Sequence, residues 1–238
     1  MLFIACALMS VTIPAEKIKI YMVGDSTMAN KKPDRYPETG WGQVLPQFFS
    51  SDVVIINKAM NGRSTKTFIN ENRWKQVLDV LQKGDYVFIQ FGHNDEKVSS
   101  EKGVPLPEYG EYLIRYVTEA RAKGAVPVLF TPIARRVFKG GKFNDTHGGY
   151  PDAMRKVAAD YQVPLVDLQQ KSSLLLTSAG TKESLKYYLH GDSGVLANYP
   201  KGIKDNTHFS EEGAKKMASL AVEGLKEVNS PLVKFLKN

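Results

Sequence analysis

Five short runs rich in Val, Ile and Phe recur along the 238-residue chain, at Lys17–Gly24, Val53–Met60, Asp85–Gly92, Val126–Pro132 and Val163–Leu168. Continuous apolar runs of this length are typical of parallel strands that are buried on both faces. Stretches with helical spacing lie between them, at Trp41–Phe49, Arg73–Gln82, Tyr109–Lys123 and Tyr150–Tyr161, and a last one spans Ser210–Val228. This alternation predicts a three-layer α/β/α fold of flavodoxin-like type, with a parallel sheet of about five strands.

The chain has the length of a single domain with a full core, and it contains no internal repeat and no low-complexity linker. We expect one domain over residues 16–238. Its irregular part, Thr177–Asn206, carries several Gly, Pro and Tyr residues, and we interpret it as a long functional loop.

The first fifteen residues, MLFIACALMSVTIPA, are apolar but too short to span a bilayer. They fit the apolar part of a secretory signal, which favours a secreted or periplasmic protein. The usual preceding basic residues are missing, so a truncated start or an apolar lead-in to the first strand stays open. Cys6 is the only cysteine and lies in this segment, which excludes an internal disulfide and leaves lipidation open.

The formal charge of +7 predicts a positive field that attracts acidic partners, such as a carboxylate-bearing polysaccharide. The basic residues are dispersed, and no run of Lys and Arg is interleaved with aromatic residues. We therefore expect neither a nucleic-acid partner nor stable membrane insertion. The oligomeric state has no signal in the sequence.

The first three predicted strands each end in polar residues, and parallel strands share one ligand-binding edge. Ser26 follows the first strand in Gly24–Thr27, where we expect it to be exposed beside the N–H groups of a helix start. Gly62 follows the second strand, and its N–H is open to a ligand; Asn94 follows the third and supplies an amide donor. Taken singly, these residues also fit a helix cap, a turn glycine and an Asx-turn.

Asp205 and His208 precede the last predicted helix, for which Ser210 is the expected N-cap. We expect both on a loop, where the three-residue spacing lets the carboxylate reach one imidazole nitrogen while the other faces a serine. A lone histidine in a loop is more often a surface residue. Support for a catalytic histidine therefore comes from the whole set of polar residues expected at this edge.

The four blocks GDST, NGRS, GHND and DNTH occur in order across almost the whole chain, which resembles the SGNH (GDSL-type) hydrolase family. The strings GDSTMA, GWGQ, NGRST, FGHND, TPIARR and DNTHFSEEGA are most similar to the rhamnogalacturonan acetylesterases of carbohydrate esterase family 12. Thr27 replaces the Leu of the founding pattern, as is usual in this subfamily. The resemblance implies Ser26 as nucleophile, His208 as base and Asp205 as the group that orients it. It also implies an oxyanion hole of Ser26, Gly62 and Asn94, with no metal or other cofactor.

The implied function is hydrolysis of acetyl esters on an acidic pectic polysaccharide or its oligosaccharides. Alternatives are the same chemistry on acetylated xylan, a lysophospholipid or a thioester, and a non-hydrolytic carbohydrate-binding relative. The intact Ser26, Asp205 and His208 set argues against the binding protein. A nucleotide-binding flavodoxin-type module is disfavoured because GDSTMAN is poor in glycine for a phosphate-binding loop.

Residues expected to contact the substrate lie near the same edge. The guanidinium groups of Arg63, Arg135 and Arg136 suit galacturonate carboxylates, although solvated surface arginine is an equal alternative. Asp25 and Tyr199 complete this set, Tyr199 as a surface for stacking on sugar rings. The GDSG string at Gly191–Gly194 is interpreted as coincidental. The pair His93 and His147 lacks the spacing of a metal site, and we expect a structural or substrate-side role for both residues.

Overall fold

The computed structural model describes residues 17–237, so the predicted signal segment 1–15 lies outside the described residues. The central sheet contains five parallel strands in the order β2-β1-β3-β4-β7. These are β1 (Ile18–Gly24), β2 (Val53–Asn57), β3 (Tyr86–Gln90), β4 (Val126–Phe130) and β7 (Leu165–Val166). Because this is the strand order of flavodoxin-like sheets, the predicted architecture is confirmed.

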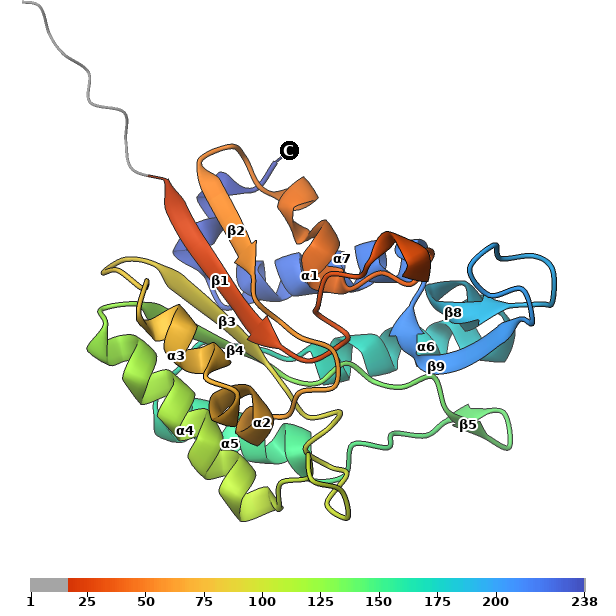
Figure 1. The fold of residues 1–238 in the computed structure, drawn as a ribbon, viewed down its shortest axis with the longest axis horizontal. Helices are drawn as coiled ribbons and strands as arrows, with labels where there is room; N and C mark the ends of the chain where they lie inside the picture. The colour runs from red at the N-terminus through yellow and green to blue at the C-terminus, as the bar shows by residue number, and fades with distance from the viewer. Residues whose placement is uncertain (1–16, 238) are drawn as a thin grey trace, which may run out of the picture.

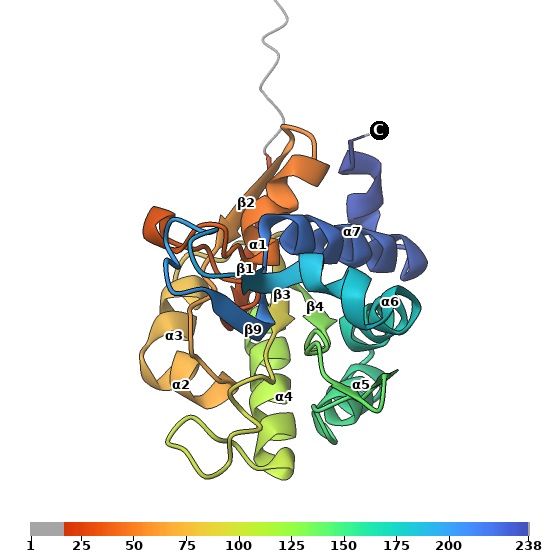
Figure 2. The ribbon, with the colours of Figure 1, turned by 90° about the vertical axis from the view of Figure 1, so that its right-hand side faces the viewer.

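Successive residues of β1 enter two different cores: Ile20 and Met22 pack on one face of the sheet, and Tyr21 and Val23 on the other. A strand covered on both faces has to be apolar throughout, which explains the continuous runs in the sequence. The first core is covered by α1 (Trp41–Val44), α6 (Leu168–Glu183) and α7 (Glu211–Glu227). The second is covered by α2 (Thr65–Asn70), α3 (Arg73–Leu78), α4 (Leu106–Ala122) and α5 (Tyr150–Asp160) (Figures 1 and 2).

Short elements connect these layers. Four 3-10 turns occupy Pro33–Arg35, Leu45–Phe48, Ser184–Tyr187 and Pro231–Phe235, and β5 (Phe138–Lys139) pairs with β6 (Lys142–Phe143). Ser210 caps α7 as expected, since its hydroxyl accepts a hydrogen bond from the Gly213 N–H. None of the helices in residues 17–237 combines the length and the apolar character needed to cross a membrane.

The interpretation of Thr177–Asn206 as a loop was wrong for most of its length. Helix α6 runs to Glu183, and β8 (Tyr188–Gly191) then pairs antiparallel with β9 (Ile203–Phe209). Gly180, with a φ of +65°, interrupts the helical geometry inside α6. Asp205 and His208 accordingly lie on strand β9, which pairs with β8, and not on the expected loop.

Candidate active site

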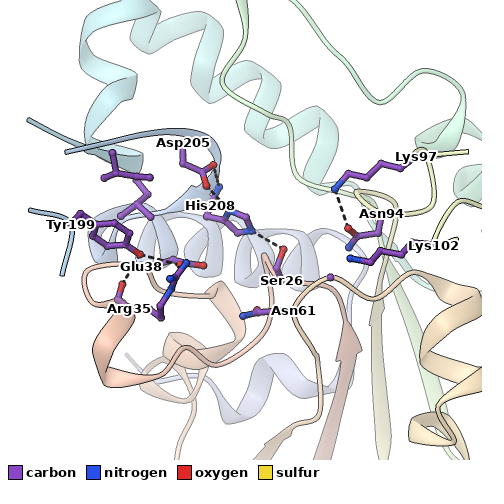
Figure 3. Close-up of a pocket in the computed structure, with 13 residues that line it drawn as sticks. Ser26, Arg35, Glu38, Asn61, Asn94, Lys97, Lys102, Tyr199, Asp205 and His208 are labelled. Atoms are coloured by element: carbon purple, nitrogen blue, oxygen red, sulfur yellow. Dashed lines mark hydrogen bonds and ion pairs between the residues drawn. The ribbon is translucent and has the colours of Figure 1, made fainter. Parts of the chain in front are cut away.

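Three of the predicted site residues come together where the strand order reverses. Ser26 follows β1, Gly62 follows β2 and Asn94 follows β3, and all three line one pocket at the carboxyl ends of these strands. In an open parallel sheet, a crevice forms at the point where neighbouring strands run out to opposite sides. Strand β9 brings Asp205 and His208 to the same pocket (Figure 3).

A continuous chain of hydrogen bonds links Asp205, His208 and Ser26. The His208 Nε2 lies 2.8 Å from the Ser26 Oγ, and its Nδ1 lies 2.7 Å from the Asp205 Oδ2 (Figure 3). Burial would raise the pKa of Asp205, but the hydrogen bond and charge of His208, with the N–H groups of His208 and Thr207, lower it to about 2. An ionised Asp205 holds the imidazole proton on Nδ1, which leaves Nε2 free to accept the Ser26 proton.

Three N–H donors belong to residues that line the pocket together with the Ser26 hydroxyl. Asn94 Nδ2 donates one hydrogen bond to the Arg63 carbonyl oxygen at 3.0 Å, and its second N–H stays available to a ligand. The backbone N–H groups of Ser26 and Gly62 have no hydrogen-bond partner within residues 17–237. Gly62 adopts a φ of +76°, a conformation that favours glycine, so the chain turns sharply there. These three donors can stabilise negative charge that develops on a bound carbonyl oxygen.

The turn that carries Ser26 differs from the expectation. No helix starts at this residue, and Ser26 itself is only 9% exposed. Gly24 packs so tightly against β3 that a Cβ on it would come within 2.6 Å of the Gln90 carbonyl oxygen. Glycine therefore lets the turn sit directly on the neighbouring strand.

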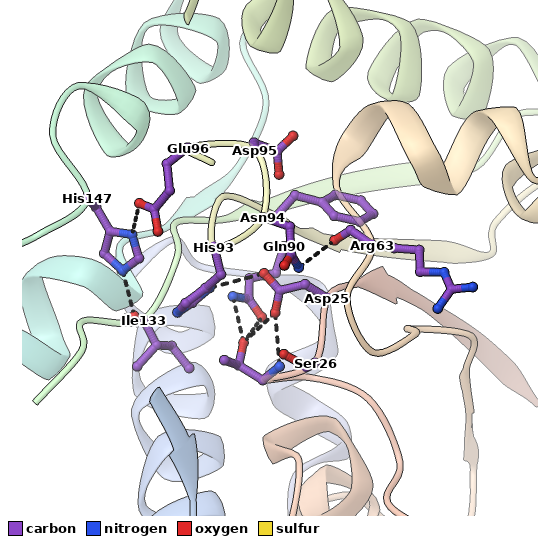
Figure 4. A network of polar contacts seen from close by, with 12 residues as sticks. Asp25, Ser26, Arg63, Gln90, His93, Asn94, Asp95, Glu96, Ile133 and His147 are labelled. Carbon is purple, nitrogen blue, oxygen red and sulfur yellow. Dashed lines mark hydrogen bonds and ion pairs between the residues drawn. The ribbon is translucent and has the colours of Figure 1, made fainter. Parts of the chain in front are cut away.

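Asp25 was wrongly predicted to contact the substrate, since its side chain is completely buried. Its carboxylate accepts hydrogen bonds from the Thr27 backbone and hydroxyl at 2.9 and 2.8 Å, and from His93 Nδ1 at 3.0 Å (Figure 4). Burial favours the neutral acid, but His93 and Thr27 outweigh it and lower the pKa of Asp25 to about 2. Burial also lowers the pKa of His93 to about 4, so at neutral pH a neutral imidazole donates to a carboxylate.

His93 and His147, which are far apart in sequence, pack ring against ring with centroids 4.7 Å apart. His147 is held by Glu96 Oε2 at 3.0 Å and by the Ile133 carbonyl oxygen at 2.8 Å (Figure 4). Within the described residues, no three His, Cys, Asp or Glu side chains are grouped to bind one metal ion. Both histidines therefore occupy structural positions in this buried network.

The pocket has a volume of about 310 Å³, which lies at the small end of the range of roughly 300–1,000 Å³ for small-molecule sites. Tyr199 lies on one wall, where its hydroxyl donates to the Arg35 carbonyl oxygen and contacts Glu38 (Figure 3). Its predicted contact with substrate stays a prediction. The residues that line the pocket are Ser26, Arg35, Glu38, Asn61, Gly62, Asn94, Lys97, Lys102, Leu189, Tyr199, Ile203, Asp205 and His208.

The three arginines predicted to bind substrate do not line this pocket. Arg63 binds the Glu71 carboxylate at 3.0 Å, Arg135 pairs with Glu96, and Arg136 donates to the Ser184 hydroxyl at 3.0 Å. These guanidinium groups already have partners within the protein, and their predicted contact with substrate stays a prediction. The cations at the pocket are Arg35, Lys97 and Lys102, and the sequence analysis missed them. The one available signal was that both lysines closely follow the GHND block.

Comparison with known proteins gives the same family as the motifs. The model of the GDSL-like Lipase/Acylhydrolase family matches residues 22–216. The rhamnogalacturonan acetylesterase RhgT of Bacillus subtilis is 41% identical over 90% of this chain and 92% of its own length. The probable rhamnogalacturonan acetylesterase YesY of the same organism is 37% identical over 91% of this chain and 96% of its own.

Among solved structures, the B. subtilis protein YxiM is similar, with a TM-score of 0.77 and 28% identity. The match covers 90% of this chain and 58% of that one, so the present chain spans little more than half of YxiM. The chain is a carboxylic ester hydrolase and belongs to the GDSL-like lipase/acylhydrolase family.

Proposed function

We propose that this protein removes O-acetyl groups from an acidic pectic polysaccharide of the rhamnogalacturonan type, with Ser26 as its nucleophile. The observation that carries this proposal is the hydrogen-bonded series Asp205–His208–Ser26, with contacts of 2.7 and 2.8 Å. A serine, a histidine and a carboxylate in this order form the arrangement that activates a hydroxyl for acyl transfer.

The reaction follows from the positions of the protons. Ser26 Oγ attacks the acetyl carbonyl carbon while His208 Nε2 takes its proton. The tetrahedral intermediate then breaks its bond to the sugar oxygen, which receives that proton from His208. Water then attacks the acetyl-Ser26 ester while His208 Nε2 takes its proton. The second tetrahedral intermediate breaks its bond to Ser26 Oγ, which receives that proton from His208, and acetate is released. Asp205 stabilises the imidazolium in both halves.

The negative oxygen of each tetrahedral intermediate is held by the N–H groups of Ser26 and Gly62 and by Asn94 Nδ2. One such donor is typically worth about a hundredfold or more in rate.

Two features support a pectic substrate. The relatives RhgT and YesY, which match over nine-tenths of the chain, bear the names of rhamnogalacturonan acetylesterases. The pocket is lined mainly by polar and charged side chains, with Leu189 and Ile203 as its aliphatic members. Such a lining suits a hydroxyl-rich sugar better than an acyl chain of a lipid.

We also propose that residues 1–15 direct export, because plant cell-wall polysaccharide is reached outside the cell. Fusing this segment to a leaderless reporter enzyme tests the proposal. Reporter activity confined to the producing cells contradicts it.

The central experiment measures acetate release from acetylated rhamnogalacturonan, acetylated xylan and p-nitrophenyl acetate by the wild type and Ser26→Ala. Ser193→Ala is the matched control, because Ser193 is exposed and belongs to the GDSG string. Release from the pectic substrate that disappears only in Ser26→Ala supports chemistry and substrate together. Ser26-dependent activity confined to the other esters rejects the pectic substrate, and no Ser26-dependent hydrolysis rejects the esterase mechanism.

A further inference from the structure

Two lysines stand on one wall of the pocket without a counter-charge. Lys97 and Lys102 follow β3 on the segment 94–105, and Figure 3 shows both on the opposite side of Ser26 from Tyr199 and Arg35. Neither ammonium group has a carboxylate within 4.0 Å among residues 17–237. Lys97 Nζ donates to the Asn94 Oδ1 at 3.2 Å, and Lys102 Nζ lies 3.2 Å from where a Cβ on Gly62 would stand.

Of the acidic groups near this wall, two are already paired, and Glu101, next to Lys102 in the sequence, is exposed and forms no ion pair with either lysine. Glu96 contacts Arg135 and His147, and Asp205 is bound to His208. On the opposite wall, Lys31 Nζ lies 2.8 Å from the Glu38 Oε1. The wall formed by Lys97 and Lys102 therefore carries positive charge that no ion pair neutralises, next to the N–H donors of the site.

The segment that carries these lysines is tightly folded. Gly103 packs on the Lys97 carbonyl oxygen so closely that a Cβ on Gly103 would lie 2.3 Å from it. Lys66 Nζ donates a hydrogen bond to the Gly103 carbonyl oxygen at 2.8 Å. The Val104 N–H donates to the Asp95 carbonyl oxygen at 2.8 Å, which closes the segment at its base. These contacts hold the backbone of the segment, so ordering on binding of an anion is confined to the two exposed lysine side chains.

We infer that Lys97 and Lys102 form a subsite for a uronate carboxylate of the substrate chain. This inference rests on the proposed function, and it names the groups that distinguish an acidic acetylated polysaccharide from a neutral one. Two ammonium groups beside the reacting ester attract a carboxylate that a neutral substrate lacks, and selectivity arises from that difference.

The first test compares kcat/KM for acetylated rhamnogalacturonan with kcat/KM for p-nitrophenyl acetate. The variants are Lys97→Met, Lys102→Met, the double Met variant and the double Arg variant. The ratio of kcat/KM for the pectic substrate to kcat/KM for p-nitrophenyl acetate should fall about tenfold in the double Met variant, mainly because KM for the pectic substrate rises. The double Arg variant should keep the wild-type ratio. The control is Lys123→Met, which removes an equal charge. Lys123 is exposed and lies before the amino end of β4, whereas the pocket lies at the carboxyl ends of the strands.

An unchanged ratio would overturn the inference. An equal loss on both substrates would do so too, because the lysines would then act on the reacting centre and not on a carboxylate.

A second test needs no catalysis and separates this inference from the proposed function. Binding of deacetylated rhamnogalacturonan oligosaccharides to Ser26→Ala is measured by calorimetry, with neutral xylo-oligosaccharides for comparison. The acidic ligand should bind about tenfold more weakly when both lysines are Met, and added NaCl should weaken binding in the parent more than in that variant. Equal binding by both proteins, or no preference for the acidic ligand, rejects the subsite even if acetate release is confirmed. If acetate release from the pectic substrate fails while this binding difference is found, the proposed function falls and the subsite stands.

Discussion

The Nδ1 of His93 lies 3.0 Å from the Oδ2 of Asp25, and the two side chains are 3% and 0% exposed. Asp25 directly precedes Ser26, and it also accepts two hydrogen bonds from Thr27 on the other side of the serine. The position of the proposed nucleophile therefore depends on one buried carboxylate that binds three donors: the backbone N–H and hydroxyl of Thr27, and the Nδ1 of His93, which follows β3.

Asp25→Asn should lower the free energy of unfolding by about 2–4 kcal/mol, because it removes a buried charge that His93 and Thr27 are arranged to bind. The amide also brings N–H donors where only acceptors fit. Urea unfolding monitored by circular dichroism measures the loss, and kcat should fall because the Ser26 turn shifts.

The control for this substitution is Asp34→Asn, on an exposed 3-10 turn. If both variants lose the same small amount, the buried pair does not stabilise the turn.

Asp95 gives a prediction of stability against pH. Its side chain is completely buried, Oδ1 accepts two hydrogen bonds from Thr65, and Oδ2 has no partner. Burial raises the pKa of Asp95 to about 7, against the opposing hydrogen bonds from Thr65. The folded protein thus keeps a proton that the unfolded chain releases near pH 4, so this contribution is complete below pH 4 and is lost as the pH rises through 7.

Asp95→Asn does not titrate, so its stability relative to the wild type should rise by up to about 4 kcal/mol between pH 4 and pH 8. Urea unfolding of both proteins at the two pH values measures this difference. A difference that does not change with pH contradicts a protonated Asp95.

Strand ends were predictable from the sequence, and the positions of Ser26, Gly62 and Asn94 followed from them. Apolar runs mark where buried strands stop, and parallel strands necessarily share an edge. Partners of long charged side chains were not predictable, because they are tertiary contacts between distant segments. Arg135 meets Glu96 and Arg136 meets Ser184 only once the chain has folded.

Helix α6 was missed for a local reason. It begins as a regular helix, but Gly180 leaves helical geometry near its end, and just three of its residues are buried. A helix with so little buried surface leaves a weak periodic pattern in the sequence. Asp205 and His208 were likewise expected on a loop, and strand β9 in fact carries them.

Asp205→Asn should reduce kcat/KM by about a thousandfold or more with the fold intact. The amide no longer holds the imidazole proton on Nδ1, so Nε2 of His208 carries it and cannot accept the proton of Ser26. Hydrolysis of p-nitrophenyl acetate measures the loss of kcat/KM, and far-ultraviolet circular dichroism checks that the fold is intact. The matched control is Asp192→Asn, an exposed residue between β8 and β9. Equal losses in the two variants would show that the hairpin, and not the carboxylate of Asp205, matters.

Asn94→Ala should lower kcat by about a hundredfold while KM changes little, because Nδ2 is proposed to bind the carbonyl oxygen more strongly as it becomes negative. The same amide also donates to the Arg63 carbonyl oxygen at 3.0 Å, so truncation loosens the segment that carries Gly62. Asn94→Asp keeps the size of the side chain but removes both donated hydrogen bonds and adds a negative charge, so it should reduce kcat at least as much as Ala. Asn70→Ala is the control, because Asn70 is the exposed last residue of α2. Steady-state kinetics on p-nitrophenyl acetate decides the matter, since a rise in KM with kcat retained would assign Asn94 to ground-state binding and leave the oxyanion to the two backbone N–H groups.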